Sequence, residues 1–224
     1  MHQLPLDLRR TDGPSFANFW TAENEEVWQA VRAVALGGRG PLYLWGPTGC
    51  GKTHLLTAAA RLAAEEGTAL CLSLDRSEPV WEAVADMPAD ALICVDGLDA
   101  LASNPVASRA LFMLFETQAP HRRLLLAARV SPAALEVSRD DLRTRLASGP
   151  VMRMKTLTDE GMAAALIHRA RERGLILDVD AARYLLTHGP RAPHALFALL
   201  DRLDIARAAG ARLTIPFLRA SLRG

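Results

Sequence analysis

The fold is decided by residues 42–64, which read LYLWGPTGCGKTHLLTAAARLAA. The apolar run at 42–45 predicts a short buried strand, and the Ala- and Leu-rich run at 53–64 predicts a helix. The segment between them fits the pattern G-x-x-x-x-G-K-[ST] and consists of Gly46, Pro47, Thr48, Gly49, Cys50, Gly51, Lys52 and Thr53. A glycine-rich turn between a strand and a helix points backbone N–H groups and the helix dipole at one phosphate. This segment is therefore predicted to bind a nucleoside di- or triphosphate.

Two residues of this loop and an aspartate further along the chain are predicted to contact the phosphates and the metal ion. Lys52 is predicted to reach the β- and γ-phosphates, and the Thr53 hydroxyl is predicted to ligate Mg²⁺. Asp96 ends an apolar strand and is expected to hold the same ion through water. Gly97 follows where many ATPases carry a second carboxylate, and Asp99 is the nearest acid. We therefore expect this chain to hydrolyse its nucleotide slowly on its own.

Strands and helices alternate over the first two thirds of the chain. Further strands are expected at residues 70–74, 91–96, 124–128 and 151–154, with helices at 25–35, 106–117 and 140–147. This alternation, with nearly continuous apolar strands, predicts an α/β fold with a parallel sheet covered on both faces. Beyond residue 156 only amphipathic helices are expected, at 158–173, 180–188, 194–208 and from 214 onward. The expected units are a tail at 1–14, an α/β nucleotide-binding domain at 15–156 and a helical domain at 157–224.

Composition narrows the class of protein. The 224 residues carry a net charge of +1, so bulk charge gives no reason to expect nucleic-acid binding. We see no apolar stretch long enough to span a bilayer and no apolar signal segment at the start. The three cysteines form no CxxC pair, and Cys71 and Cys94 lie in apolar runs where cysteine acts as a small hydrophobe. A reducing cytoplasm is the expected compartment.

Several cationic residues have two interpretations. Arg143 and Arg145 lie on the short predicted helix at 140–147, and either could project across a subunit interface or simply be solvated. An arginine supplied in trans to a γ-phosphate accelerates hydrolysis by about 10³–10⁵-fold. Arg191 and His194 precede the third helix of the helical domain. They either touch the nucleotide phosphates or merely flank a helix start.

Two segments near the start are also open to two interpretations. The segment 3–8 contains apolar residues within a predicted tail, which suits a peptide that docks in a partner's pocket, or it resembles such a peptide by chance. Its candidate contact residues are Gln3, Leu4, Leu6 and Leu8. The aromatic residues Phe16, Phe19 and Trp20 either line an adenine pocket or pack against the sheet.

Taken together, these motifs resemble those of AAA+ ATPases of the DnaA type, over nearly the whole chain. The resemblance is carried by the phosphate loop, the strand that ends at Asp96, the helix containing Arg145 and the final group of helices. The runs FANFW at 16–20, LYLW at 42–45 and LTIPF at 213–217 strengthen it. It implies a five-stranded parallel sheet in the order 5-1-4-3-2, helices on both faces and a C-terminal α-helical lid. The sequence stops at Gly224, after the lid, so we expect no helix-turn-helix DNA-binding domain and no direct sequence-specific DNA binding.

The resemblance also implies a role and a set of partners. It extends to a regulatory member of the family that inactivates DnaA, because Gln3, Leu6 and Leu8 match sliding-clamp-binding peptides of bacterial replication proteins. Arg145 falls at the position of the arginine finger, which would enter the ATP site of DnaA. His194 stands in place of the second sensor arginine, with Arg191 nearby. The implied cofactors are ADP or ATP with Mg²⁺, the implied partners are DnaA and the polymerase III sliding clamp, and a homo-oligomer stays open.

The implied function is thus negative regulation of replication initiation. The protein would act while docked on the sliding clamp, and would therefore be found at the nucleoid. The residues at the first sensor, Ala128 and Arg129, depart from the polar or acidic residues usual in the family, which favours a nucleotide-holding regulator. The main alternative is a helicase loader or remodeller of the DnaC type that cycles nucleotide itself. A DnaA paralogue that binds DNA through its core is a third interpretation, against which the near-neutral charge weighs.

Overall fold

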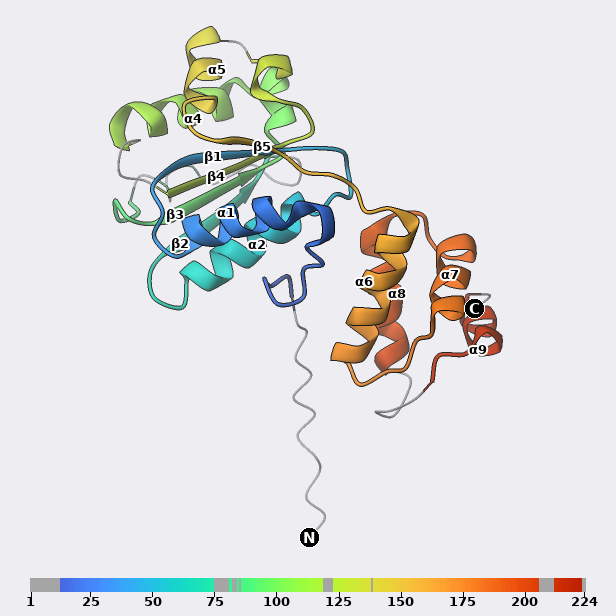
Figure 1. Cartoon of the computed structure of the whole chain (residues 1–224). Coiled ribbons are helices and arrows are strands. Elements are labelled where there is room, and N and C mark those ends of the chain that lie inside the picture. Colours follow the sequence, from blue (N-terminus) through green and yellow to red (C-terminus); the bar gives the residue numbers. More distant parts are fainter. Residues whose placement is uncertain are drawn as a thin grey trace.

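The computed structural model describes residues 13–74, 81, 84, 86–118, 123–137, 139–205 and 212–222. These residues form an α/β part and a group of helices beside it (Figure 1). The predicted clamp-binding residues Gln3, Leu4, Leu6 and Leu8 lie outside the described residues, so their role stays a prediction.

The α/β part is built on a five-stranded parallel sheet. Its strands are β1 (Gly40–Trp45), β2 (Ala69–Ser73), β3 (Leu92–Asp96), β4 (Arg123–Ala128) and β5 (Val151–Arg153). They are hydrogen-bonded in the order β2-β3-β4-β1-β5, and all four neighbouring pairs are parallel. The predicted order 5-1-4-3-2 is therefore confirmed. The central strands β3 and β4 are almost continuously buried, as expected for strands covered on both faces.

Helices cover both faces of this sheet. On one face lie α1 (Glu25–Ala35) and α2 (Lys52–Ala63), and on the other lie α4 (Pro105–Gln118) and α5 (Asp140–Leu146) (Figure 1). Short 3-10 helices occupy Ala22–Asn24, Leu98–Ser103 and Pro132–Ala134. Each face has its own hydrophobic core, so the sheet is stabilised by burial from both sides.

The remaining helices form a third core, separate from those of the sheet. They are α6 (Asp159–Glu172), α7 (Val179–His188), α8 (Pro193–Ile205) and α9 (Ile215–Ser221), and we call them the lid. Side-chain caps begin two of them: Thr158 accepts a hydrogen bond from the Gly161 N–H at 3.1 Å, and Asp178 accepts one from the Ala181 N–H at 2.8 Å. The start at Thr158 agrees with the sequence. Thr214 precedes α9 as expected, but its side chain makes no capping hydrogen bond.

Asn24 holds the segment of chain that leads from β5 into the lid. Its side chain is only 2% exposed, and it forms two hydrogen bonds with the backbone of Lys155. Its Nδ2 donates to the Lys155 carbonyl at 2.9 Å, and its Oδ1 accepts from the Lys155 N–H at 2.8 Å. Lys155 follows β5 and precedes the lid, so the chain is fixed to the α/β part immediately before it enters α6.

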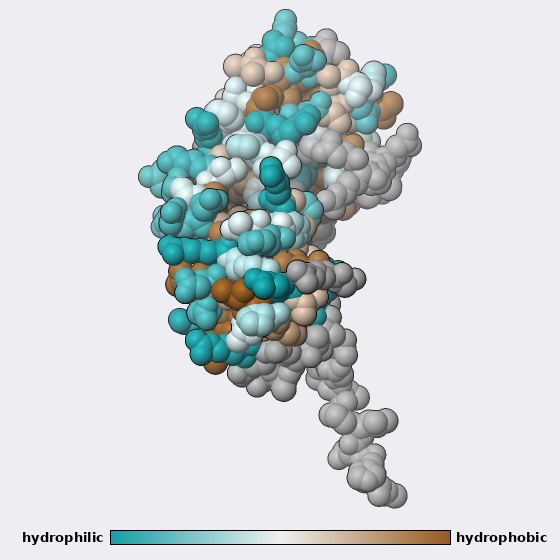
Figure 2. Space-filling model, turned by 90° about the vertical axis from the view of Figure 1, so that its right-hand side faces the viewer, coloured by the Kyte–Doolittle hydropathy of each residue, from teal (hydrophilic) through white to brown (hydrophobic). Residues whose placement is uncertain are grey.

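Figure 2, which faces the lid side, shows hydrophilic residues interspersed with small, separate hydrophobic groups. Ile176 and Val179 in the lid are among the large apolar residues that are exposed. Within the part of the chain that the structure describes, no helix combines the length and the apolar character needed to cross a bilayer.

Candidate nucleotide-binding site

The phosphate loop links β1 to α2 and takes a shape that only glycine tolerates at two positions. Gly49 and Gly51 have φ angles of +84° and +101°, in the left-handed region. A Cβ on Gly51 would lie 2.7 Å from the ring of Phe19, and one on Gly49 would lie 3.2 Å from Pro193. The loop is therefore enclosed by an aromatic ring from the N-terminal segment and by the start of α8. The sequence predicted this loop between a strand and a helix, and both are present.

Lys52, the first residue of α2, holds its ammonium group across the loop. The Nζ atom donates to the carbonyl oxygens of Gly46 at 2.7 Å and Pro47 at 3.0 Å. These contacts hold the positive charge beside the backbone N–H groups of the loop and the N-terminus of α2. Positive charge and helix dipole then act together on an anion placed there. The predicted placement of Lys52 at the phosphate loop is consistent with this geometry.

Thr53 and Asp96 meet at the end of the sheet. The Thr53 Oγ1 donates to Asp96 Oδ2 at 2.5 Å, and Asp96 Oδ1 accepts from the Gly97 N–H at 2.9 Å. A hydroxyl and a carboxylate are oxygen ligands of the kind that Mg²⁺ takes, and Mg²⁺ usually keeps several waters and substrate phosphates as its other ligands. No group of three or more His, Cys, Asp or Glu side chains suited to a metal occurs among the described residues. The pair fits Mg²⁺ bound jointly with phosphate.

Asp99, the acid nearest to the missing second carboxylate, is already engaged. Its Oδ2 accepts from the Arg129 backbone N–H at 2.9 Å and lies 3.4 Å from Arg129 Nε. Burial, and secondly the charge of Asp99, raise the pKa of the neighbouring Tyr43 hydroxyl, which donates to the Val130 carbonyl at 3.0 Å. Asp99 is thus held by Arg129, the residue that directly follows β4.

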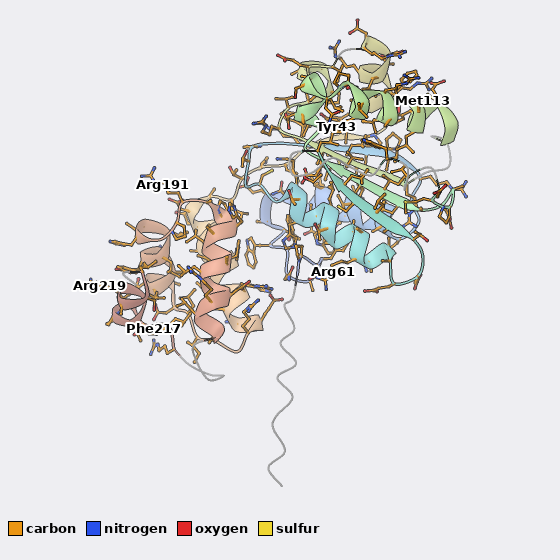
Figure 3. All side chains as sticks on the ribbon, turned by 180° about the vertical axis from the view of Figure 1, so that it is seen from behind. Tyr43, Arg61, Met113, Arg191, Phe217 and Arg219 are labelled. Atoms are coloured by element: carbon orange, nitrogen blue, oxygen red, sulfur yellow. The ribbon has the colours of Figure 1, made fainter. Side chains whose placement is uncertain are left out.

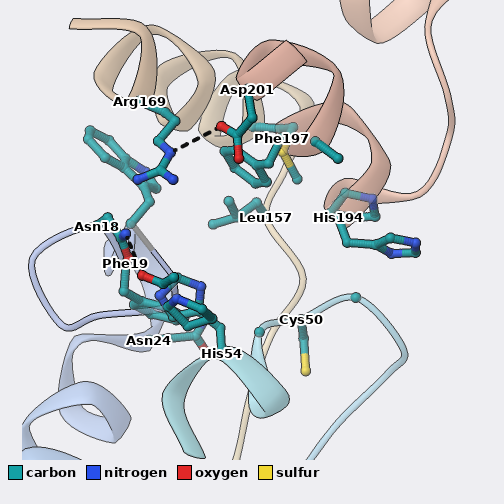
Figure 4. A pocket seen from close by; sticks show the side chains of 18 residues that line it. Asn18, Phe19, Asn24, Cys50, His54, Leu157, Arg169, His194, Phe197 and Asp201 are labelled. Carbon is teal, nitrogen blue, oxygen red and sulfur yellow. Dashed lines mark hydrogen bonds and ion pairs between the residues drawn. The ribbon is translucent and has the colours of Figure 1, made fainter. Parts of the chain in front are cut away.

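A cavity of about 340 Å³ opens beside the phosphate loop, between the N-terminal segment and the lid (Figure 4). It is lined by Gly13, Pro14, Asn18, Phe19, Trp20, Asn24, Gly49, Cys50, Gly51, His54, Leu157, Met162, Arg169, Pro193, His194, Phe197, Ala198 and Asp201. Phe19 and Trp20 therefore line a cavity beside the phosphate loop, and its use as an adenine pocket stays a prediction. Phe16 instead packs edge-to-face on Trp28 of α1, with ring centroids 5.6 Å apart. The volume and the mainly apolar wall suit a nucleoside.

The two lid residues predicted to approach the nucleotide differ in position. His194, in the first turn of α8, lines the cavity. Arg191 lies before α8 and is exposed, and it is not among the described residues that line the cavity. In Figure 3 its side chain projects from the lid surface. Arg169 on α6 is the arginine that faces the cavity, and its side chain is 12% exposed and 3.7 Å from Asp201 (Figure 4). In this conformation only His194 of the predicted pair is brought to the site.

His54 is a cavity residue that the sequence did not single out. Its Nε2 lies 3.0 Å from the Ser15 carbonyl, and its ring centroid lies 5.3 Å from that of Phe19. Burial lowers the pKa of His54, the hydrogen bond to Ser15 opposes this shift, and the charge of Arg169 adds to it. A neutral imidazole that donates from Nε2 is therefore favoured. His54 directly follows Thr53, so its position after the motif was the available signal.

Arg145 lies on the opposite face of the sheet from α2 (Figure 1). Leu142 and Leu146 are fully buried and anchor α5, whereas the Arg145 side chain is 48% exposed. Its Nη2 forms an ion pair with Glu116 Oε1 on α4 at 2.6 Å. Arg143 pairs with Asp140 on its own helix, also at 2.6 Å. Arg145 is thus exposed to solvent and does not line the cavity beside the phosphate loop.

Comparison with known proteins finds a match for the lid and matches for the fold of the chain. The family model for the lid domain of Hda matches residues 159–222. Among solved structures, domain III of the replication initiation protein DnaA from Thermotoga maritima superposes with a TM-score of 0.75 at 16% identity, covering 93% of this chain and 95% of that one. AMPPCP-bound DnaA from Aquifex aeolicus gives 0.69 at 19% identity, covering 94% and 69%.

A variant of RuvB from Thermotoga maritima matches as well, with a TM-score of 0.67 at 17% identity, covering 94% of this chain and 71% of that one. At these identities the structural matches establish the fold alone. The match to the Hda lid domain concerns residues 159–222, which contain α6 to α9.

Proposed function

We propose that this chain binds an adenine nucleotide and regulates the replication initiator DnaA, because its lid matches the model for the Hda lid domain and its fold is that of domain III of DnaA. The observation that carries the proposal is the position of Arg145. This guanidinium is exposed on α5 and stands outside the cavity of its own chain. An arginine in that position is available to a second molecule, which is what regulation in trans requires.

The proposed ligand is ADP or ATP with Mg²⁺. The backbone of the phosphate loop and Lys52 would hold the phosphates, and Thr53 and Asp96 would hold the ion, directly and through water respectively. The ion would neutralise phosphate charge when bound. The nucleoside would occupy the cavity against Phe19, with His194 reaching it from the lid. The solved DnaA of Aquifex aeolicus holds an ATP analogue, which supports this choice of ligand.

Hydrolysis by this chain itself is proposed to be slow. No carboxylate follows Asp96 directly, since Gly97 occupies that position. Asp99 is held by the backbone and side chain of Arg129 and would have to break both contacts to orient a water molecule. The nucleotide would then act chiefly as a bound ligand that keeps the lid on the α/β part.

The chemistry is proposed to occur in the partner. Arg145 would enter the ATP site of DnaA and stabilise the charge that develops on the γ-phosphate in the transition state. Converting DnaA–ATP to DnaA–ADP would stop re-initiation. The N-terminal segment with Gln3, Leu4, Leu6 and Leu8 would anchor the protein to the DNA-loaded sliding clamp, and this step rests on the sequence alone.

The test is the rate of ATP hydrolysis by DnaA, measured with and without this protein and the DNA-loaded clamp. We expect stimulation that requires both additions and that Arg145→Ala abolishes without reducing clamp binding. Replacing Gln3 and Leu6 by Ala should abolish clamp binding in a pull-down. Full stimulation by Arg145→Ala would refute the trans mechanism, and rapid multiple turnover by the isolated protein would favour a self-cycling loader.

A further inference from the structure

Two cysteines at the edge of the sheet have no role in the proposed function. Cys71 lies on β2 and Cys94 on β3, and both are free thiols. The sequence predicted that both behave as small core hydrophobes. This holds for Cys94, which is completely buried, but Cys71 is exposed because β2 is an edge strand. We propose that Cys71 and Cys94 form a vicinal dithiol that small disulfides oxidise to an intramolecular disulfide bond.

The strand register puts the two residues directly opposite each other. Cys71 is the partner of Cys94 in the parallel pairing of β2 with β3. Paired residues on neighbouring strands share a face of the sheet, and the strands lie about 4.8 Å apart. Disulfides span Cα–Cα distances of about 4.4–6.8 Å. The strand register therefore places the two residues within the span of a disulfide bond.

The two thiols differ in access, which sets the order of reaction. Cys71 can meet a solute, whereas Cys94 lies under α2 and its Sγ donates to the Leu56 carbonyl at 3.5 Å. Cys71 is thus the attacking residue and Cys94 the resolving residue.

The reaction with glutathione disulfide balances in two steps. The Cys71 thiolate attacks one sulfur of glutathione disulfide, forms a mixed disulfide and releases one glutathione thiolate. The Cys94 sulfur then attacks the Cys71 sulfur and displaces the second glutathione. Two protein thiols are oxidised, one glutathione disulfide is reduced to two glutathione molecules, and the two thiol protons pass to them. No further oxidant is needed.

Cys50 offers an internal control. It lies in the phosphate loop after β1, and β4 separates β1 from β3, so Cys50 is not a neighbour of Cys94 in the sheet. Trypsin should release the three cysteines on separate peptides, Cys50 on 40–52, Cys71 on 62–76 and Cys94 on 77–109. Each possible linkage therefore gives a different cross-linked pair.

The experiment treats the full-length folded protein with glutathione disulfide, quenches with acid and maps the peptides by mass spectrometry without reduction. We expect the intact protein to lose two hydrogens and the peptides 62–76 and 77–109 to appear linked. Dithiothreitol should reverse both changes. A wild-type protein that stops at a glutathione adduct on Cys71, or that links Cys50 or a second copy instead, would overturn the proposal.

Two variants test the assigned order. Cys94→Ala should stop at the mixed disulfide and gain one glutathionyl group at Cys71. Cys71→Ala should leave Cys94 unmodified while the protein is folded, because the remaining thiol is shielded. Oxidation of Cys94 in the folded Cys71→Ala protein would show that the order is wrong. The wild-type peptide map decides the main proposal even if Cys94→Ala does not fold.

Discussion

The ion pair between Arg145 and Glu116 makes a specific prediction about the proposed arginine finger. To reach a partner's nucleotide, the guanidinium must leave the Glu116 carboxylate, from which it is separated by 2.6 Å. Glu116→Gln removes the negative charge and keeps the side-chain shape. We therefore expect this variant to stimulate DnaA–ATP hydrolysis more strongly than the wild type.

The size of the effect of Glu116→Gln follows from the solvent exposure of the ion pair. The side chains of Arg145 and Glu116 are 48% and 41% exposed, so solvent screens the pair. Such pairs are worth about 0–1 kcal/mol, which corresponds to at most about a fivefold change. Arg145→Ala, in contrast, should remove most of an effect of about 10³–10⁵-fold. We therefore expect a small gain in stimulation from Glu116→Gln and a large loss from Arg145→Ala.

The assay is single-turnover hydrolysis of DnaA-bound ATP at a subsaturating concentration of this protein with loaded clamp. Asp140→Asn is the matched control, because it removes an ion pair of the same length from Arg143 on the same helix. It should change stimulation by less than Glu116→Gln does. If Glu116→Gln reduced stimulation as much as Arg145→Ala, Glu116 would belong to the contact surface, and the idea that it restrains the finger would be wrong.

Three other predictions concern the candidate nucleotide site and its supports. Lys52→Ala removes the ammonium group proposed to contact the phosphates, and a hydrogen bond to a charged group is worth about 1.5–3 kcal/mol. Calorimetry should therefore show ADP affinity falling by at least about tenfold, whereas Arg191→Ala, outside the cavity, should leave it unchanged. Asn24→Ala leaves the backbone N–H and C=O of Lys155 without these partners and should lower the free energy of unfolding in urea by about 2–3 kcal/mol. A loss below about 0.5 kcal/mol would contradict the role of Asn24 in holding Lys155. The folded-state pKa of His54 is lowered, so its stabilising contribution is complete above about pH 6.5 and is lost as the pH falls. Thermal unfolding of His54→Asn should accordingly depend less on pH over that range than the wild type does, and equal slopes would argue against a buried neutral imidazole.

Local motifs made much of the fold predictable. The strand–loop–helix at the phosphate loop is encoded within residues 42–64, and Asp96 could be assigned because a parallel sheet brings strand ends to one edge. The contact between Thr53 and Asp96 joins residues 43 positions apart, yet it follows from that topology. The strand order itself came from the family resemblance, and the structure agrees with it.

The cavity was harder to predict because three distant segments build it. Asn24 and His54 carry no motif, and their roles depend on the positions of Lys155 and Ser15 respectively. Arg191 and His194 were indistinguishable in sequence, but α8 begins at Pro193, so only His194 lies in its first turn and reaches the cavity. Pairwise contacts of this kind depend on packing between elements, which periodicity does not report.

The attachment of Lys155 by Asn24 limits how the lid can turn. Lys155 is fixed to the α/β part, and the side chain of Thr158 is engaged at the start of α6, so Thr156 and Leu157 alone separate these two anchors. Backbone rotation at two residues offers only about four soft torsions, which confines the lid to a narrow set of swinging directions. Leu157 also lines the cavity. A ligand that contacts Leu157 would therefore act directly on the two-residue hinge between the α/β part and the lid.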